Sequence, residues 1–223
     1  MRARVAIVAA LTLALAGCAG GPNGPRKLKP VANPSAVVAT ELAFARAAQE
    51  DGQWKAFRKY ADKSAILLLE SGPVNARSWL AGKADPAQPV TWEPLAVWSS
   101  CDGSLAVSKF AFTDPTDGTS GEGYTVWKRD RPDRYRYLFD MGYAAPRAEA
   151  PEMIRADVAE CKAAPAAPAS GAVGQSDDGS LAWSYSFENG VRSLRVWTSG
   201  KAGPKLAIDQ SVPAGDRSNR TGN

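Results

Sequence analysis

The sequence contains no histidine, which removes the side chain most often used as a general base and a common protein ligand of zinc. Ser-His-Asp and Cys-His nucleophilic sites are excluded for the same reason. Only three of the 223 residues are cysteines, and a thiolate metal site would need further ligands. We therefore expect neither a metal ion nor another cofactor, and any chemistry has to use carboxylates, arginine, tyrosine or water.

Most of the chain also has no excess of positive or negative charge. The formal net charge is +4, but five Lys and Arg residues and no acidic residue precede position 34. From Pro34 onward there are 22 basic and 23 acidic residues. A near-neutral folded part does not favour nucleic acid as a partner.

The N-terminal apolar run is too short to cross a membrane. Arg2 and Arg4 precede an uncharged run from Val5 to Gly17, whereas a spanning helix needs about 20 apolar residues. This pattern predicts a secretory signal peptide that is removed. The residues Leu-Ala-Gly-Cys that end at Cys18 resemble the bacterial lipobox, in which the cysteine becomes a lipid-modified N-terminus.

That resemblance implies a membrane partner, reached through a lipid anchor on Cys18. The next residue is Ala19 and not the aspartate that favours inner-membrane retention, so we expect the outer membrane, facing the periplasm. The alternative is an ordinary signal peptide in which Cys18 is not modified.

Composition divides the chain into five parts. Residues 1–17 form the predicted signal peptide, and residues 18–33 form a flexible tether rich in glycine and proline. Residues 34–143 are predicted to be the main domain. Residues 144–212 contain an Ala/Pro-rich connector and a β extension, and residues 213–223 are expected to be disordered.

Helical patterns come first in the main domain and strand patterns follow. Val38, Leu42 and Ala45 have helical spacing within 34–50, and a shorter helix is predicted after Gly52. This order predicts an α+β domain with helices on one face of an antiparallel sheet. A helical turn is expected at 75–80, and strands are expected at 66–69, 90–99, 105–112, 123–128 and 134–143.

Several segments in this order resemble the nuclear transport factor 2-like superfamily, in particular its SnoaL-like polyketide-cyclase branch. The resemblance implies a cone-shaped fold, with a curved sheet around a long helix and an apolar pocket at one end. It also implies a homodimer formed through the sheet. The segments are residues 41–45, 51–54, 61–62, 92–94, 99–107 and 123–127.

A strand pattern returns near the C-terminus. Asp178-Gly179-Ser180-Leu181-Ala182 repeats residues 102–106, and Leu181, Trp183 and Tyr185 alternate with small residues. Either this is a duplicated β unit that extends the sheet or caps the pocket, or two Asp-Gly hairpins have converged. Cys101 and Cys161 are expected to form a disulfide, since the predicted compartment is oxidising.

Candidate pocket residues are acidic, basic or aromatic side chains on elements that are able to face the pocket. None belongs to a catalytic motif. Strand alternation places Asp140 with Arg136 and Leu138, opposite Tyr137, and this favours a solvated strand residue. The candidates are Tyr60, Asp62, Glu70, Arg77, Trp79, Trp98 and Asp140.

Two hypotheses of function follow. The first is a lipid-anchored periplasmic module that binds an apolar small molecule or supports the envelope through a protein partner, without catalysis. The second is a small-molecule enzyme of the polyketide-cyclase or isomerase type that uses a pocket carboxylate.

Overall fold

The computed structural model describes residues 31–149, 151–161 and 174–213. The predicted signal peptide, Cys18, the tether up to residue 30 and the predicted tail from residue 214 lie outside the described residues. Within the described ranges, no helix has both the length and the apolar character that a membrane span requires.

Three helices of the described part of the chain lie on one side of the first sheet: α2 (Pro34–Glu50), α3 (Gln53–Tyr60) and α4 (Ala76–Leu80). The side chain of Asn33 caps α2 by accepting a hydrogen bond from the Ala36 N–H at 3.3 Å. The chain turns after α2 at Gly52, whose φ of 111° suits glycine. The predicted long and short helices are therefore confirmed.

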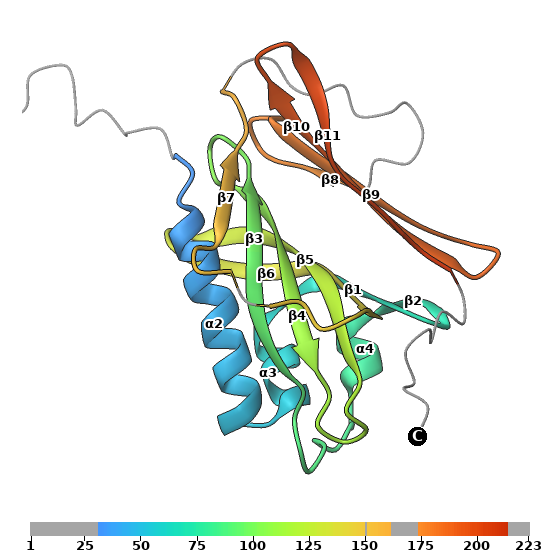
Figure 1. Ribbon diagram of the computed structural model, residues 1–223. Coiled ribbons are helices and arrows are strands. Elements are labelled where there is room, and N and C mark those ends of the chain that lie inside the picture. Colours follow the sequence, from blue (N-terminus) through green and yellow to red (C-terminus); the bar gives the residue numbers. More distant parts are fainter. Residues whose placement is uncertain (1–30, 150, 162–173, 214–223) are drawn as a thin grey trace, which may run out of the picture.

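The first sheet has seven strands in the order β2-β1-β6-β5-β4-β3-β7 and packs against α2 (Figure 1). The sequence predicted an antiparallel sheet, but the observed sheet is mixed, because β1 pairs with β6 and β3 pairs with β7 in parallel. The strands are β1 (Ala61–Leu69), β2 (Gly72–Asn75), β3 (Thr91–Ser99), β4 (Leu105–Thr113), β5 (Ser120–Arg131), β6 (Arg134–Ala144) and β7 (Arg155–Val158).

The predicted C-terminal β extension forms a separate four-stranded sheet in the order β11-β10-β9-β8. It covers the face of the first sheet that points away from the helices (Figure 1). Leu181, Trp183 and Leu194 of this second sheet pack there against Val107 and Phe139. The strands are β8 (Gly174–Gln175), β9 (Leu181–Glu188), β10 (Val191–Gly200) and β11 (Gly203–Val212).

The architecture confirms an α+β fold with N-terminal helices packed on a sheet and a C-terminal meander. Its arrangement bears directly on the predicted homodimer. The outer face of the first sheet is already covered by the chain's own second sheet. A dimer would therefore have to use another surface, and dimer formation stays a prediction.

The turns before β4 and β9 have the same internal hydrogen bonds. In the first turn Asp102 Oδ1 accepts from the backbone and hydroxyl of Ser104, and in the second Asp178 Oδ1 accepts from those of Ser180. The first is followed by β4, β5 and β6, and the second by β9, β10 and β11, so each begins a three-stranded meander. This shared geometry favours the duplicated-unit interpretation of the sequence.

The predicted disulfide between Cys101 and Cys161 is confirmed, with 5.1 Å between the two Cα atoms. It joins the segment just after β3 to the segment just after β7, and these two strands are paired. The bridge therefore fastens the edge strand β7 to the sheet.

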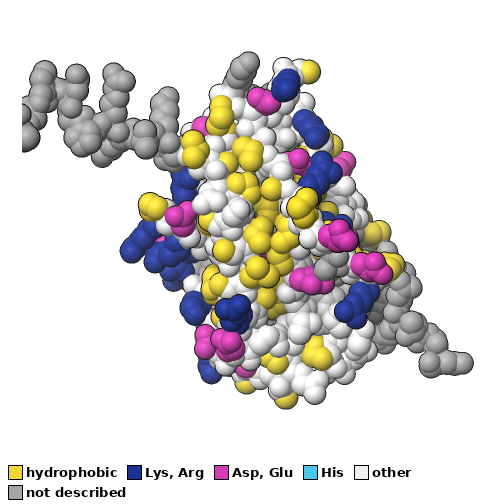
Figure 2. Space-filling view, turned by 60° about the vertical axis from the view of Figure 1, so that its left-hand side comes forward, with side chains coloured by type: hydrophobic (Ala, Val, Ile, Leu, Met, Phe, Trp, Pro, Cys, Tyr) yellow, Lys and Arg dark blue, Asp and Glu magenta, His cyan; other side chains and the backbone are white. Residues whose placement is uncertain are grey.

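The outer surface of α2 carries few charges. Ala39, Leu42 and Ala43 are exposed there, whereas Glu41 on the same helix is fully buried. Figure 2, turned so that this side of the molecule comes forward, shows hydrophobic side chains along the middle of the face and charged ones on both sides.

Candidate functional site

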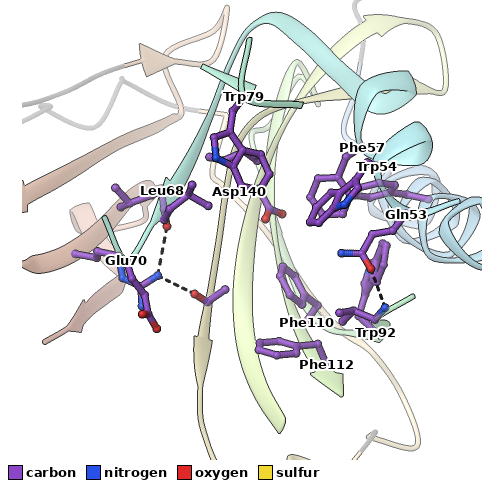
Figure 3. A pocket seen from close by; sticks show the side chains of 16 residues that line it. Gln53, Trp54, Phe57, Leu68, Glu70, Trp79, Trp92, Phe110, Phe112 and Asp140 are labelled. Carbon is purple, nitrogen blue, oxygen red and sulfur yellow. Dashed lines mark hydrogen bonds between the residues drawn. The ribbon is translucent and has the colours of Figure 1, made fainter. Parts of the chain in front are cut away.

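A cavity of about 280 Å³ lies between α3, α4 and the helix-facing side of the first sheet. Its lining is mainly aromatic, which suits a flat or apolar ligand body. Figure 3 shows rings entering it from both the helices and the strands. The aromatic lining residues are Phe44, Trp54, Phe57, Trp79, Trp92, Phe110 and Phe112.

Two glycines of β5 make room for the rings of β4. Gly123 is paired with Phe110 and Gly121 with Phe112. A Cβ atom at either glycine would collide with the neighbouring ring. The two phenyl rings therefore lie close to the backbone of β5 and form part of the cavity wall.

A β-bulge in β6 turns Asp140 into the cavity. Tyr137 pairs with Trp127 and Phe139 pairs with Val126, so Leu138 is an extra residue between two consecutive pairs. Tyr137 consequently packs on the helix side, while Phe139 packs against the second sheet. The interpretation of Asp140 as a solvated residue is thus wrong, because strict alternation does not hold across a bulge.

Asp140 sits in surroundings that favour its neutral form. Burial raises its pKa to about 7, the hydrogen bond from Thr125 opposes the shift, and the charge of Glu41 adds to it. Thr125 Oγ1 donates to Asp140 Oδ2 at 2.8 Å. Near neutral pH, Asp140 can therefore either give or take a proton.

Gln53 supplies a second polar group, from the first turn of α3. Its Oε1 accepts a hydrogen bond from the Val90 N–H at 2.8 Å, which fixes the orientation of the amide. The Nε2 group points into the cavity (Figure 3) and has no hydrogen-bond partner among the described residues. Sequence reasoning missed Gln53, and a single glutamine in a helix gives no signal of its own.

Arg192 reaches the cavity from β10 in the second sheet. Its Nη1 donates to the backbone oxygens of Leu68 at 3.3 Å and Gly142 at 2.9 Å. Sequence reasoning missed it as well, although there was a signal. Arg192 alternates in register with Leu194 and Val196, which are both core residues, so its position predicts a buried side chain.

Three of the seven predicted pocket residues line the cavity, namely Glu70, Trp79 and Asp140. Trp98 lies on the opposite face of the sheet, because its neighbour Val97 takes the helix-facing position of β3. The expectation that Trp98 faces the cavity was therefore wrong.

The other three predicted residues also lie outside the cavity. Tyr60 packs against Phe44, with 4.9 Å between the ring centroids, and its exposed side faces a separate surface depression. Asp62 accepts hydrogen bonds from the backbone and side chain of Ser64, and Arg77 is exposed on α4. The direction of each of these three side chains depends on its local packing or hydrogen bonds, which residue spacing alone does not predict.

Glu41 forms a separate buried network behind the cavity. Its carboxylate accepts from Trp92 Nε1 at 2.9 Å, Ser108 Oγ at 2.5 Å and Trp127 Nε1 at 3.1 Å. Burial raises its pKa, and these hydrogen bonds oppose the shift. Glu41 therefore ties α2 to β3, β4 and β5.

Metal-binding geometry is not found in the described part of the chain, where no three Cys, Asp or Glu side chains come together to hold an ion. The site is instead an aromatic cavity with a carboxyl group, an amide and a guanidinium on its walls.

No protein-family model and no curated protein matches the chain. Solved structures resemble it weakly. A nuclear transport factor 2-like protein of unknown function from Shewanella oneidensis MR-1 is 12% identical, with a TM-score of 0.39, and the match covers 49% of this chain and 97% of that one. A protein of the same superfamily from Salmonella enterica serovar Typhimurium is 13% identical, with a TM-score of 0.37, and 53% of this chain and 95% of that one are covered.

The hub of a CaMKII from S. rosetta is similar to the same extent. It is 16% identical, with a TM-score of 0.37, and the match covers 56% of this chain and the whole of that one. At these values the comparisons give no information on ligand or activity, which have to be argued from the cavity.

Proposed function

We propose that the protein binds an apolar small molecule with a ring system in the cavity lined by Trp54, Trp79 and Phe110. The observation that carries this proposal is the aromatic lining around an open space of about 280 Å³. A purely supportive role in the envelope would not need an open space of this kind. Gln53 Nε2 and Asp140 supply polar points that would orient the ligand.

Binding of the neutral dye N-phenyl-1-naphthylamine tests the proposal, because its fluorescence rises in apolar surroundings. A substitution Gly142→Leu should abolish the rise, since a Cβ atom there meets only the Phe112 ring at 3.5 Å and the added side chain would fill the cavity. Ala87→Leu in an exposed connector is the matched control. Equal binding by all three proteins would disprove the proposal.

A second candidate function is proton transfer at a carbon next to a carbonyl group. The specific observation is Asp140, whose pKa of about 7 suits a general base at neutral pH. The Nε2 group of Gln53 would donate a hydrogen bond to the carbonyl oxygen. This chemistry requires neither histidine nor a metal.

Exchange of the α-protons of 2-tetralone in D2O, followed by NMR, tests this second candidate. The wild-type protein should accelerate deuterium uptake, and Asp140→Asn should reduce it to the background rate. Asp130→Asn, at an exposed carboxylate, is the control. If the wild-type protein binds the ketone but exchange stays at the background rate, the second candidate is wrong and the protein only binds the ligand.

We also propose that the protein is exported and held on the periplasmic side of the outer membrane by lipid on Cys18. The support comes from the sequence before Cys18 and from the Cys101–Cys161 disulfide, which suits an oxidising compartment. Mass spectrometry of the N-terminal peptide should find acylated cysteine, and Cys18→Ser should release the protein from membranes. An unmodified Cys18 in the membrane fraction would contradict the anchor.

A further inference from the structure

Arg192 places a positive charge in the wall of the cavity from outside the first sheet. The residue is 4% exposed, and it shares the inner face of β10 with Leu194 and Val196. An apolar side chain would satisfy the packing there without the cost of burying a charge. The guanidinium therefore needs an explanation beyond covering the sheet.

Most hydrogen-bond donors of this guanidinium are unused by the protein. The two backbone oxygens, of Leu68 and Gly142, both accept from Nη1 (dashed lines in Figure 3). A guanidinium has five N–H groups, so three remain on Nε and Nη2. Within residues 31–149, 151–161 and 174–213 these three have no acceptor, and Arg192 forms no ion pair there. The edge formed by Nε and Nη2 matches the two oxygens of a carboxylate.

Glu70 also lines this part of the cavity and acts on the same charge. Burial lowers the pKa of Arg192, and the negative charge of Glu70 opposes this change. Glu70 is exposed and does not pair with the guanidinium, so solvent weakens its effect. The free edge of Arg192 remains the one cationic group in the described cavity lining.

We propose that the ligand of this cavity carries a carboxylate or a similar oxyanion, and that Arg192 binds this group while the aromatic walls hold the apolar body. The inference rests on the proposed function, since it names the ligand class of the same cavity. It gives the second sheet a role in ligand selection in addition to its role in covering the first sheet.

A matched pair of dyes separates the anionic group from the apolar body. 8-Anilinonaphthalene-1-sulfonate differs from N-phenyl-1-naphthylamine only by its sulfonate. In the full protein, Arg192→Gln should weaken binding of the sulfonate dye by at least about tenfold, the size expected for a charge-assisted hydrogen bond. Because the neutral dye has no anionic group, its binding should fall by a clearly smaller factor, and its remaining binding would show that the cavity is intact.

Three further variants keep the test decisive if Arg192→Gln folds poorly. Arg192→Lys keeps the positive charge but loses the paired N–H donors of the guanidinium edge, so it should bind the sulfonate dye with intermediate affinity. Glu70→Gln changes an exposed residue and should strengthen binding of the sulfonate dye a few-fold. Arg195→Gln removes the same charge from an exposed site nearby on β10 and should have no effect on either dye.

The outcomes distinguish the two proposals. Failure of both dyes to bind the wild-type protein would overturn the proposed function. Two outcomes would overturn only the anion site. In the first, both dyes bind the wild-type protein and Arg192→Gln weakens their binding by the same factor. In the second, Arg192→Gln and Arg195→Gln change binding of the sulfonate dye equally. Naphthalene-2-carboxylate and 2-naphthyl phosphate, used as competitors, then show which oxyanion is preferred.

Discussion

Ser104 and Ser180 occupy equivalent positions in two similar turns, and each accepts a hydrogen bond from the other turn. Ser180 Oγ accepts from the Cys101 N–H and Ser104 Oγ accepts from the Asp177 N–H, both at 2.8 Å. The exchange is reciprocal, as at an interface between two identical subunits. Here it joins the two sheets of one chain at the start of β4 and β9.

Ser180→Ala should lower the free energy of unfolding by about 1–3 kcal/mol, because the Cys101 N–H loses its partner. Ser104→Ala should cost a similar amount through the Asp177 N–H. Ser71→Ala, at an exposed position, serves as the control and should stay within about 0.5 kcal/mol. Urea unfolding measures all three, and a neutral effect of both turn variants would show that the reciprocal bonds do not contribute to stability.

Glu41→Gln should also destabilise the protein by about 1–3 kcal/mol. The amide keeps the size of the side chain, but its NH2 group would face a donor in place of an acceptor oxygen. Glu50→Gln, at the exposed end of the same helix, should have little effect. The emission of Trp92 and Trp127, whose indoles donate to Glu41, should change only in Glu41→Gln.

Most of the fold could be predicted because its elements have regular apolar periods. The spacing of Val38, Leu42 and Ala45 predicted α2, although the buried face of this helix carries Val37, Glu41 and Phe44 and Leu42 is exposed. The alternation from Leu181 to Tyr185 predicted β9. Short edge strands such as β2 and β8 were missed, since two to four residues contain no period. The pairing order, including the parallel β1 and β6, depends on contacts between distant residues that the local pattern does not contain.

The site was less predictable because it depends on departures from regularity. The bulge at Leu138 turns the side chain of Asp140 towards the cavity. A leucine at this position gives no sign of a bulge in the sequence. Arg192 comes from the second sheet and meets β1 and β6 only after the two sheets pack. Glu70 and Trp79 were predicted correctly. Glu70 directly follows the buried strand β1, and Trp79 lies on the short helix α4.

The ionisation of Asp140 should make stability depend on pH. Burial raises its folded pKa to about 7, above the 3.8 of an unperturbed aspartate. Below about pH 4 both the folded and the unfolded state are protonated, and the full stability is present. As the pH rises towards 7 the unfolded state ionises first, so stability falls and the loss is complete above about pH 7.

Asp140→Asn should remove this component of the pH dependence. The difference in melting temperature between Asp140→Asn and the wild type should grow by several degrees from pH 4 to pH 8, since about 1 kcal/mol corresponds to roughly 2–4 °C in a protein of this size. Glu41 is present in both proteins, so its own titration largely cancels. A constant difference across this range would contradict the raised pKa.

Removal of the disulfide should cost up to about 4 kcal/mol, the chain-entropy value for a separation of 60 residues. The comparison is between Cys101→Ser/Cys161→Ser and its parent, both carrying Cys18→Ser, in urea with and without dithiothreitol. Reductant should lower the parent to the level of the variant and leave the variant unchanged. Sensitivity of the variant to reductant would point to another cause.

The order of the sheets along the chain has a consequence for biosynthesis. The outer face of the first sheet, including Leu105, Val107 and Phe139, packs against strands that come later in the chain. A nascent or shortened chain that ends before β9 displays this apolar face to solvent and to other chains. The C-terminal sheet is therefore needed to complete the buried core of the domain that precedes it, and a chain shortened to the first sheet alone should aggregate.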